Sequence, residues 1–330
     1  MSTFSIKLED MPYIYYEELS KNPRVPTNHL AKRVKVARNT AAKYLDEFIE
    51  ERILFSPQLR IKMTTQMVEY VYLLKTKDPL SFSKILTNHN SVFYTCMLGG
   101  AFNILFMSYT PLTISHLHGY ENTILAGIRS DYVVPKVPNR DFSTGWKAMM
   151  EKMENQNPPE KSMIPNSLPE GGKWTPELWE LYNYLKYDVR IGFTPLVKKF
   201  KFKTTTFYSR NKDVLNLTDV FVPYYPLGEK RYTSFYLLFK TDYQQFIIES
   251  FGELPVYSTH MRIKDFLLSY VKIPFGPIGE PFLQVISLWQ HKGIIESFEH
   301  SIPWWFEVSS HPGMEPPPPI SPNGTIPSDR

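Results

Sequence analysis

The sequence is short of cysteine, of long apolar runs and of charge of one sign. Cys96 is the one cysteine in 330 residues, which excludes a disulfide framework and a cysteine-based zinc site and fits a reducing compartment. The first ten residues carry acidic side chains and no apolar stretch, so we expect no secretion signal. Residues 85–120 hold no Lys, Arg, Asp or Glu, but Asn, Gly and Pro interrupt them, which favours buried strands over a membrane helix. We therefore expect a cytoplasmic protein with no membrane partner.

The overall charge says little about partners, because the formal net charge is only +4. Hydrophobic residues make up 42% of the chain and aromatic residues 15%, which is enough apolar mass for ordinary globular cores. The position of the charges must therefore indicate which partner the protein binds.

The chain contains an internal repeat. Residues 30–40 (LAKRVKVARNT) resemble residues 196–206 (LVKKFKFKTTT) at an offset of 166, and Tyr72-Leu73-Leu74 matches Tyr236-Leu237-Leu238 at an offset of 164. One nearly constant offset across two unlike motifs predicts two copies of one structural unit.

The first part of each unit has the pattern of a winged helix-turn-helix. In the first unit we expect helices over residues 12–21, 27–34 and 38–50, then a hairpin of residues 53–55 and 59–62. In the second unit we expect helices over residues 179–186, 194–200 and 204–214.

The second part of each unit reads as alternating strands and helices. In the first unit the expected elements are a strand over 70–74, a helix over 79–86 and strands over 92–98 and 101–109, with a weaker closing pair within 114–134. In the second unit they are a strand over 235–239, a helix over 243–251, strands over 256–260 and 266–271, a helix over 281–291 and a strand over 293–298. The order βαββαβ is that of a ferredoxin-like domain.

The predicted fold class is therefore α+β, a tandem repeat of a winged helix-turn-helix and a ferredoxin-like regulatory domain. The predicted domains are a first winged helix-turn-helix (1–66), a first ferredoxin-like domain (67–150), a linker (151–173), a second winged helix-turn-helix (174–230), a second ferredoxin-like domain (231–311) and a Pro-rich tail (312–330).

This plan resembles the leucine-responsive regulator (Lrp/AsnC) family of transcription factors. The residues that carry the resemblance are Leu30-Ala31-Lys32-Arg33-Val34, Arg38-Asn39-Thr40 and Tyr44-Leu45, with Gly99 to Leu105 similar to the family's Gly-x-aromatic-Asp-apolar hairpin. Asn103 stands where the family has Asp, and a duplication within one chain departs from the family pattern. The resemblance implies DNA binding and assembly through the ferredoxin-like domains into a homo-oligomer, and leaves a small-molecule effector open.

The charge pattern of the two helix-turn-helix segments indicates double-stranded DNA as the partner. Residues 27–45 and 189–212 hold five and seven Lys or Arg, and neither segment holds an Asp or Glu. Cations neutralise phosphates, and Arg and Asn at the start of a recognition helix suit guanine and adenine edges. The predicted DNA contacts are Lys32, Arg33, Lys35, Arg38, Asn39, Thr40, Lys43, Arg60, Lys62, Lys198, Lys199, Lys201, Lys203, Thr204, Thr205 and Arg210.

The sequence shows no strong enzyme signal, so we expect a regulator without catalytic residues, cofactor or metal. His116 and His118 have a metal-like spacing but no nearby carboxylate or Cys partner, and Gly99-Gly100 lacks the lysine of a phosphate loop. Two alternatives stay open. One is an enzyme on the same plan, as in the siroheme decarboxylases, and the other is a module whose winged helices bind protein.

Overall fold

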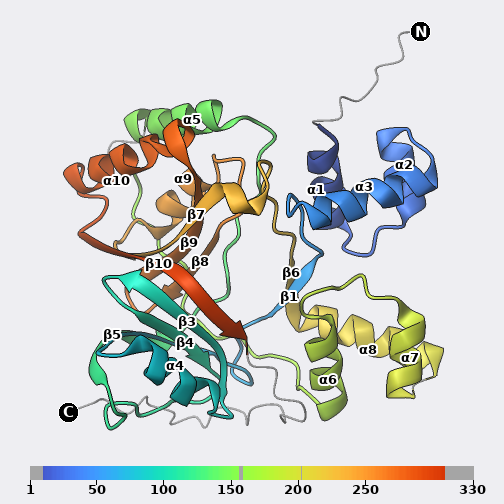
Figure 1. Ribbon diagram of the computed structural model, residues 1–330, viewed down its shortest axis with the longest axis horizontal. Coiled ribbons are helices and arrows are strands. Elements are labelled where there is room, and N and C mark those ends of the chain that lie inside the picture. The colour runs from blue at the N-terminus through green and yellow to red at the C-terminus, as the bar shows by residue number, and fades with distance from the viewer. Residues whose placement is uncertain (1–9, 156–158, 202, 309–330) are drawn as a thin grey trace.

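The computed structural model describes residues 10–155, 159–201 and 203–308. Two clusters of helices lie at one end of the molecule, and a large curled antiparallel sheet with its covering helices lies at the other (Figure 1). The fold is therefore of the mixed α+β class. The predicted Pro-rich tail at 312–330 lies outside the described residues.

The first helix cluster consists of α1 (Met11–Lys21), α2 (Thr27–Val34) and α3 (Arg38–Glu50), as the apolar spacing predicted. Tyr15 and Leu30 are fully buried among these helices, and the Tyr15 hydroxyl donates to the Ala41 carbonyl at 3.0 Å. The turn after α2 requires a left-handed residue, which is Lys35 at φ 57°.

The second helix cluster consists of α6 (Pro176–Leu185), α7 (Phe193–Phe200) and α8 (Thr204–Asn216). The Thr175 side chain accepts from the Leu178 backbone and begins α6, and Pro176 stands at the first helical position, where it displaces no needed donor. The turn after α7 again places a lysine, Lys201, in the left-handed region at φ 52°.

The hairpin that we predicted from residues 53–55 and 59–62 is wrong. The strand β1 (Gln58–Ile61) pairs with β6 (Thr218–Phe221), which lies about 160 residues later, and Leu54 bridges Tyr224 beside it. The two antiparallel segments connect the helix clusters to the sheet. Arg60 and Lys62 therefore lie on this connection and not on a wing.

The sheet has eight strands in the order β5-β2-β4-β3-β10-β7-β9-β8. Its strands are β2 (Tyr70–Thr76), β3 (Val92–Gly100), β4 (Ile104–Ser108), β5 (Tyr120–Ile128), β7 (Tyr232–Lys240), β8 (Thr259–Ile263), β9 (Phe266–Pro274) and β10 (Ser297–Val308). We call β5-β2-β4-β3 the first half-sheet and β10-β7-β9-β8 the second; they join where β3 pairs with β10. The outer strands come together as well, because Arg129 bridges Ile263 and Val133 bridges His260, so the sheet curls upon itself.

Helices α4 (Pro79–Thr87), α9 (Gln244–Phe251) and α10 (Pro281–His291) form close to their predicted positions. A further helix, α5 (Phe142–Asn155), crosses the boundary that we predicted between 150 and 151. It packs on α9, and its buried Trp146 and Met149 belong to the core that covers the second half-sheet. The predicted linker is also held in place after residue 158, since the Ser162 amide donates to the Asp242 carbonyl at 3.0 Å.

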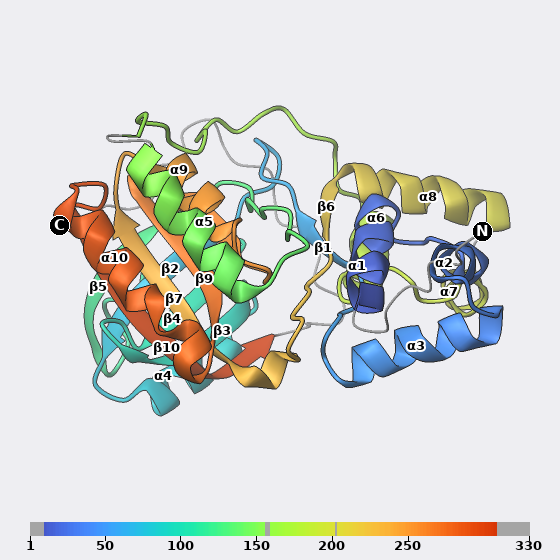
Figure 2. The ribbon, with the colours of Figure 1, turned by 90° about the horizontal axis from the view of Figure 1, so that it is seen from above.

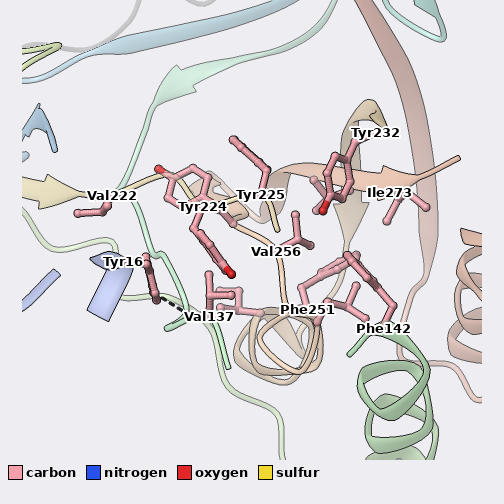
Figure 3. Packing of buried hydrophobic residues seen from close by; sticks show 14 of the residues in the cluster. Tyr16, Val137, Phe142, Val222, Tyr224, Tyr225, Tyr232, Phe251, Val256 and Ile273 are labelled. Atoms are coloured by element: carbon pink, nitrogen blue, oxygen red, sulfur yellow. Dashed lines mark hydrogen bonds between the residues drawn. The ribbon is translucent and has the colours of Figure 1, made fainter. Parts of the chain in front are cut away.

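Each helix cluster packs mainly against the half-sheet of the other half of the chain. One core joins the first helix cluster to the second half-sheet, and another joins the second helix cluster to β1 and the edge of the first half-sheet. Figure 1 shows the two helix clusters one above the other at one end of the molecule, with β1 and β6 between them and the sheet. Figure 3 shows the first of these cores, where the Tyr16 hydroxyl accepts from the Val137 amide at 2.9 Å and Tyr224 stacks beside it. Within the described residues, no helix combines the length and the apolar character that crossing a bilayer requires.

Candidate functional site

A cavity of about 550 Å³ lies where the second helix cluster, the β1–β6 connection and both half-sheets meet. Its walls are largely aromatic, with Tyr182 and Tyr187 from the end of α6, Tyr94 and Tyr109 from the first half-sheet side, and Tyr236 from the second. A volume of this size at a junction of structural units is typical of small-molecule sites. The cavity is therefore the candidate functional site.

The end of β10 lines the cavity beyond the point where this strand leaves β7. Strand β10 pairs with β7 only up to Ser301, whereas it follows β3 to Val308. Beyond Ser301, the side chains of Trp304 and Phe306 line the cavity and remain 60% and 66% exposed. Large aromatic surfaces at an opening can stack on the face of a planar ligand.

Two cations face the cavity without a carboxylate partner among the described residues. Arg60 on β1 donates to the Leu59 carbonyl at 2.8 Å and to the Gln58 amide oxygen at 2.8 Å. Lys186, which follows α6 and is 7% exposed, donates to the Asn183 amide oxygen at 3.0 Å. Burial, and then the charge of Arg60, lowers the pKa of Lys186 to about 8.

The other charges around the cavity are paired. Glu69 binds Arg129 at 2.7 Å through Nε, and the arginine also donates to the carbonyls of Ser130 and Ile61. On the opposite wall, Lys272 contacts Glu229 at 3.0 Å and the Ser234 hydroxyl at 2.9 Å. The positive charge that is left uncompensated in the cavity therefore comes from Arg60 and Lys186.

The tyrosines supply hydrogen-bond donors. The hydroxyls of Tyr94 and Tyr236 lie 3.0 Å apart, and burial raises the pKa of both well above the ordinary tyrosine value. Burial likewise raises the pKa of Tyr182 and Tyr257. These hydroxyls stay protonated at neutral pH and can donate to anionic oxygens of a ligand.

The structure brings only one of the predicted DNA contacts, Arg60, into this cavity. Lys62, two residues on, lies outside it, 3.7 Å from Asp219. Our placement of both on a wing fails because their strand pairs with β6.

The remaining predicted contacts lie in the helix clusters. Arg33 contacts Glu18 at 3.1 Å, Lys43 contacts Glu47 at 3.3 Å and Arg210 contacts Asp213 at 3.7 Å. Thr40 is partly buried. Arg33 and Lys43 are exposed despite these contacts, as are Lys32, Lys35, Arg38, Asn39, Lys198, Lys199, Lys201, Lys203, Thr204 and Thr205. They gather toward the end of the molecule that lies away from the sheet (Figure 2).

Sequence reasoning missed most of the cavity. Lys186, Glu69, Arg129 and Lys272 stand in four separate segments, and none belongs to a spaced motif. Within the described residues, no group of three or more His, Cys, Asp or Glu could hold a metal ion, and His116 and His118 are exposed.

No protein-family model matches the sequence, and no curated protein matches it. Among solved structures, the siroheme decarboxylase NirDL is similar at 10% identity and a TM-score of 0.48, covering 90% of this chain and 91% of that one. The same enzyme with an iron-uroporphyrin III analogue gives 10% identity and a TM-score of 0.45, over 89% and 92% of the two chains. A protein named PH0061 gives 19% identity and a TM-score of 0.27 over 37% of this chain and 91% of its own.

These comparisons correct one prediction. We expected a chain that is not an enzyme, and that expectation is wrong, because solved structures that match nine-tenths of the chain are of a decarboxylase. Regulation through DNA binding is not a property that these structures name.

Proposed function

We propose that this chain is an enzyme that binds a carboxylated tetrapyrrole in the cavity and removes carboxyl groups from it. The observation that carries the proposal is the pair of uncompensated cations, Arg60 and Lys186, in an aromatic-walled cavity. NirDL is named as a siroheme decarboxylase, and the cavity described above has side chains suited to the same class of substrate.

The walls and the charges suit two different parts of such a molecule. Shielding a cation from water is costly unless an anion compensates it, so Arg60 and Lys186 favour a ligand with carboxylates. Tyr182, Tyr236 and Trp304 offer aromatic faces and edges for a flat conjugated ring. A tetrapyrrole with acidic side chains presents both features.

Decarboxylation needs a proton donor as well as a binding site. When an acetate side chain R–CH₂–COO⁻ loses CO₂, the carbon keeps the electron pair and takes up one proton to become R–CH₃. The ammonium of Lys186 releases a proton more readily than an ordinary lysine, because burial and Arg60 lower its pKa to about 8. Arg60 would hold a carboxylate that is retained.

Titration with siroheme, followed by visible absorbance, tests the binding step. Arg60→Ala should weaken binding about 10- to 100-fold, because a hydrogen bond to a charged group contributes about 1.5–3 kcal/mol. Lys62→Ala is the matched control, since Lys62 lies on the same connection but outside the cavity. Mass spectrometry of the bound macrocycle should show the loss of CO₂. A macrocycle that leaves the absorbance unchanged, or that binds the Arg60→Ala protein equally well, would contradict the proposal.

We also infer that the chain is a tandem repeat of a winged helix-turn-helix and a ferredoxin-like domain. In both helix clusters, the turn after the second helix contains a lysine whose backbone is left-handed. These lysines, Lys35 and Lys201, are 166 residues apart. The two clusters also form reciprocal hydrogen bonds through one arginine each. Arg24 donates to the Ile191 carbonyl at 3.1 Å, and Arg190 donates to the Val25 carbonyl at 2.9 Å. Both half-sheets order their strands as fourth, first, third, second, which supports a shared plan.

DNA binding is a second candidate function, favoured by the exposed cations at the free end of both helix clusters. Helices α3 and α8 both begin at that end, with α2 and α7 between them in the view from above (Figure 2). Their exposed first residues, Arg38 and Lys203 among them, suit phosphates and base edges.

Fluorescence anisotropy with genomic DNA fragments across a salt series tests this second function. The logarithm of the association constant should fall with the logarithm of salt concentration, by about 0.9 for each phosphate neutralised. Lys32→Ala should reduce that slope by about 1, whereas Lys147→Ala, on the exposed face of α5, should leave it unchanged. Affinity that is indifferent to salt would argue for protein-binding winged helices instead.

A further inference from the structure

Lys186 stands out among the lysines of the cavity because its amine has no acidic partner among the residues that the structure describes. Its side chain is nearly enclosed, its Nζ donates to the Asn183 amide oxygen, and its charge lies 5.3 Å from the Tyr187 ring centre. Lys272 on the opposite wall, by contrast, is paired with Glu229. For an enclosed amine whose hydrogen-bond partners are neutral, the charged form is less stable than it is in water.

The surroundings of Lys186 also favour the free amine. Burial and then the guanidinium of Arg60 lower its pKa to about 8, while Glu69 acts in the opposite direction. At pH 7 about a tenth of such amines are unprotonated, roughly 300 times the fraction for a lysine of ordinary pKa. An unprotonated amine beside a second cation is a nucleophile for carbonyl carbon.

We propose that Lys186 forms imines with small carbonyl compounds that carry a carboxylate, such as 2-oxo acids and aldehydo acids, with Arg60 binding the carboxylate. This reactivity goes beyond the proposed tetrapyrrole chemistry and uses the same cavity. The class of substrate follows from the juxtaposition of one nucleophilic amine and one fixed cation.

The reaction balances without an oxidant or a reductant. The Lys186 lone pair adds to the carbonyl carbon, and one proton moves from the nitrogen to the former carbonyl oxygen to give a neutral carbinolamine. The hydroxyl then takes a second proton, the C–O bond breaks as water leaves, and the nitrogen lone pair forms the C=N bond. The iminium nitrogen finally releases its remaining proton to the group that protonated the hydroxyl, so that two protons leave nitrogen and two leave with the water. Tyr182 and Tyr187 line the cavity beside Lys186, and burial raises the pKa of both, so their hydroxyls are protonated and can donate to the departing oxygen.

Reductive trapping with glyoxylate and cyanoborohydride tests the proposal on the full chain, without a tetrapyrrole. Peptide mapping by mass spectrometry should find one carboxymethyl group at Lys186, formed at least tenfold faster than at Lys198, which is exposed. Labelling of Lys186 should rise with pH around a midpoint near 8. Labelling that is spread evenly over exposed lysines, or that lacks this midpoint, would overturn the proposal.

Two variants test the roles of the two cations in this reaction. Lys186→Arg removes the primary amine, so it should abolish trapping at this site. Arg60→Ala should slow trapping of glyoxylate about tenfold or more, and should slow trapping of formaldehyde, which has no carboxylate, much less. Equal slowing with both aldehydes would overturn the role of Arg60. Trapping by a chain that does not bind siroheme would refute the tetrapyrrole proposal and leave this one standing.

Discussion

Glu69→Ala should lower the free energy of unfolding by about 3–5 kcal/mol, because it leaves Arg129 charged, buried and without its carboxylate. Arg129 is fully buried, Glu69 is 5% exposed at its side chain, and the two are joined at 2.6 Å through Nη2. The carbonyls of Ser130 and Ile61 accept from the same guanidinium but cannot neutralise it. Urea unfolding followed by circular dichroism measures the loss.

Two controls identify the cause of that loss. Glu151→Ala removes one partner of an exposed helical ion pair, Lys147–Glu151, and should change stability by less than about 0.5 kcal/mol. The double variant Glu69→Leu/Arg129→Met removes both buried charges and should recover much of the loss. A Glu69→Ala protein that unfolds at the same urea concentration as the parent would show that Arg129 is compensated elsewhere.

Gly100→Ala should destabilise the protein by about 2–4 kcal/mol, combining backbone strain with overlap at the junction of the half-sheets. Gly100 has φ +145°, a conformation that residues with side chains rarely adopt, and an added Cβ would overlap the His300 carbonyl. It would also lie 2.7 Å from the Ser301 hydroxyl, which donates to the Phe102 carbonyl and holds the turn against β10.

The neighbouring glycine provides the matched control for this substitution. A Cβ on Gly99 meets no atom within 4 Å, so Gly99→Ala should change stability by no more than about 0.5 kcal/mol. Thermal unfolding of the two variants side by side makes the comparison. Equal midpoints for the two proteins would mean that the turn can shift away from β10 at little cost.

Much of the secondary structure was predictable because its signals are local. The helix over Pro281–His291 was predicted at its observed bounds, and the strands on either side of Gly99-Gly100 pair as expected. Helix α5 carried a readable pattern too, with Phe142, Trp146, Met149 and Met153 at helical spacing. The predicted boundary between residues 150 and 151 cut this helix, because the Pro- and Gly-rich composition of a linker begins within a few residues of its end.

The errors arise where distant segments decide the structure. Leu59 and Ile61 alternate as a strand should, but nothing in residues 53–62 reveals that the partner is β6. The cavity illustrates the same limit, since Arg60 looked like a phosphate contact while its strand was assigned to a wing. The role of Lys186 in the same cavity could be inferred only from the structure, which places the end of α6 beside β1.

The place of β10 in the sheet has a consequence for how the protein is synthesised. Strand β3 ends at Gly100, and the strand that pairs with its outer edge begins at Ser297, about 200 residues later. At about 5–20 residues per second, a ribosome needs roughly 10–40 seconds to cover that distance. For this interval the nascent chain presents the bare edge of β3 to its surroundings, where other chains can pair with it. Chaperones that shield strand edges should therefore engage the growing polypeptide in this interval and leave once β10 docks.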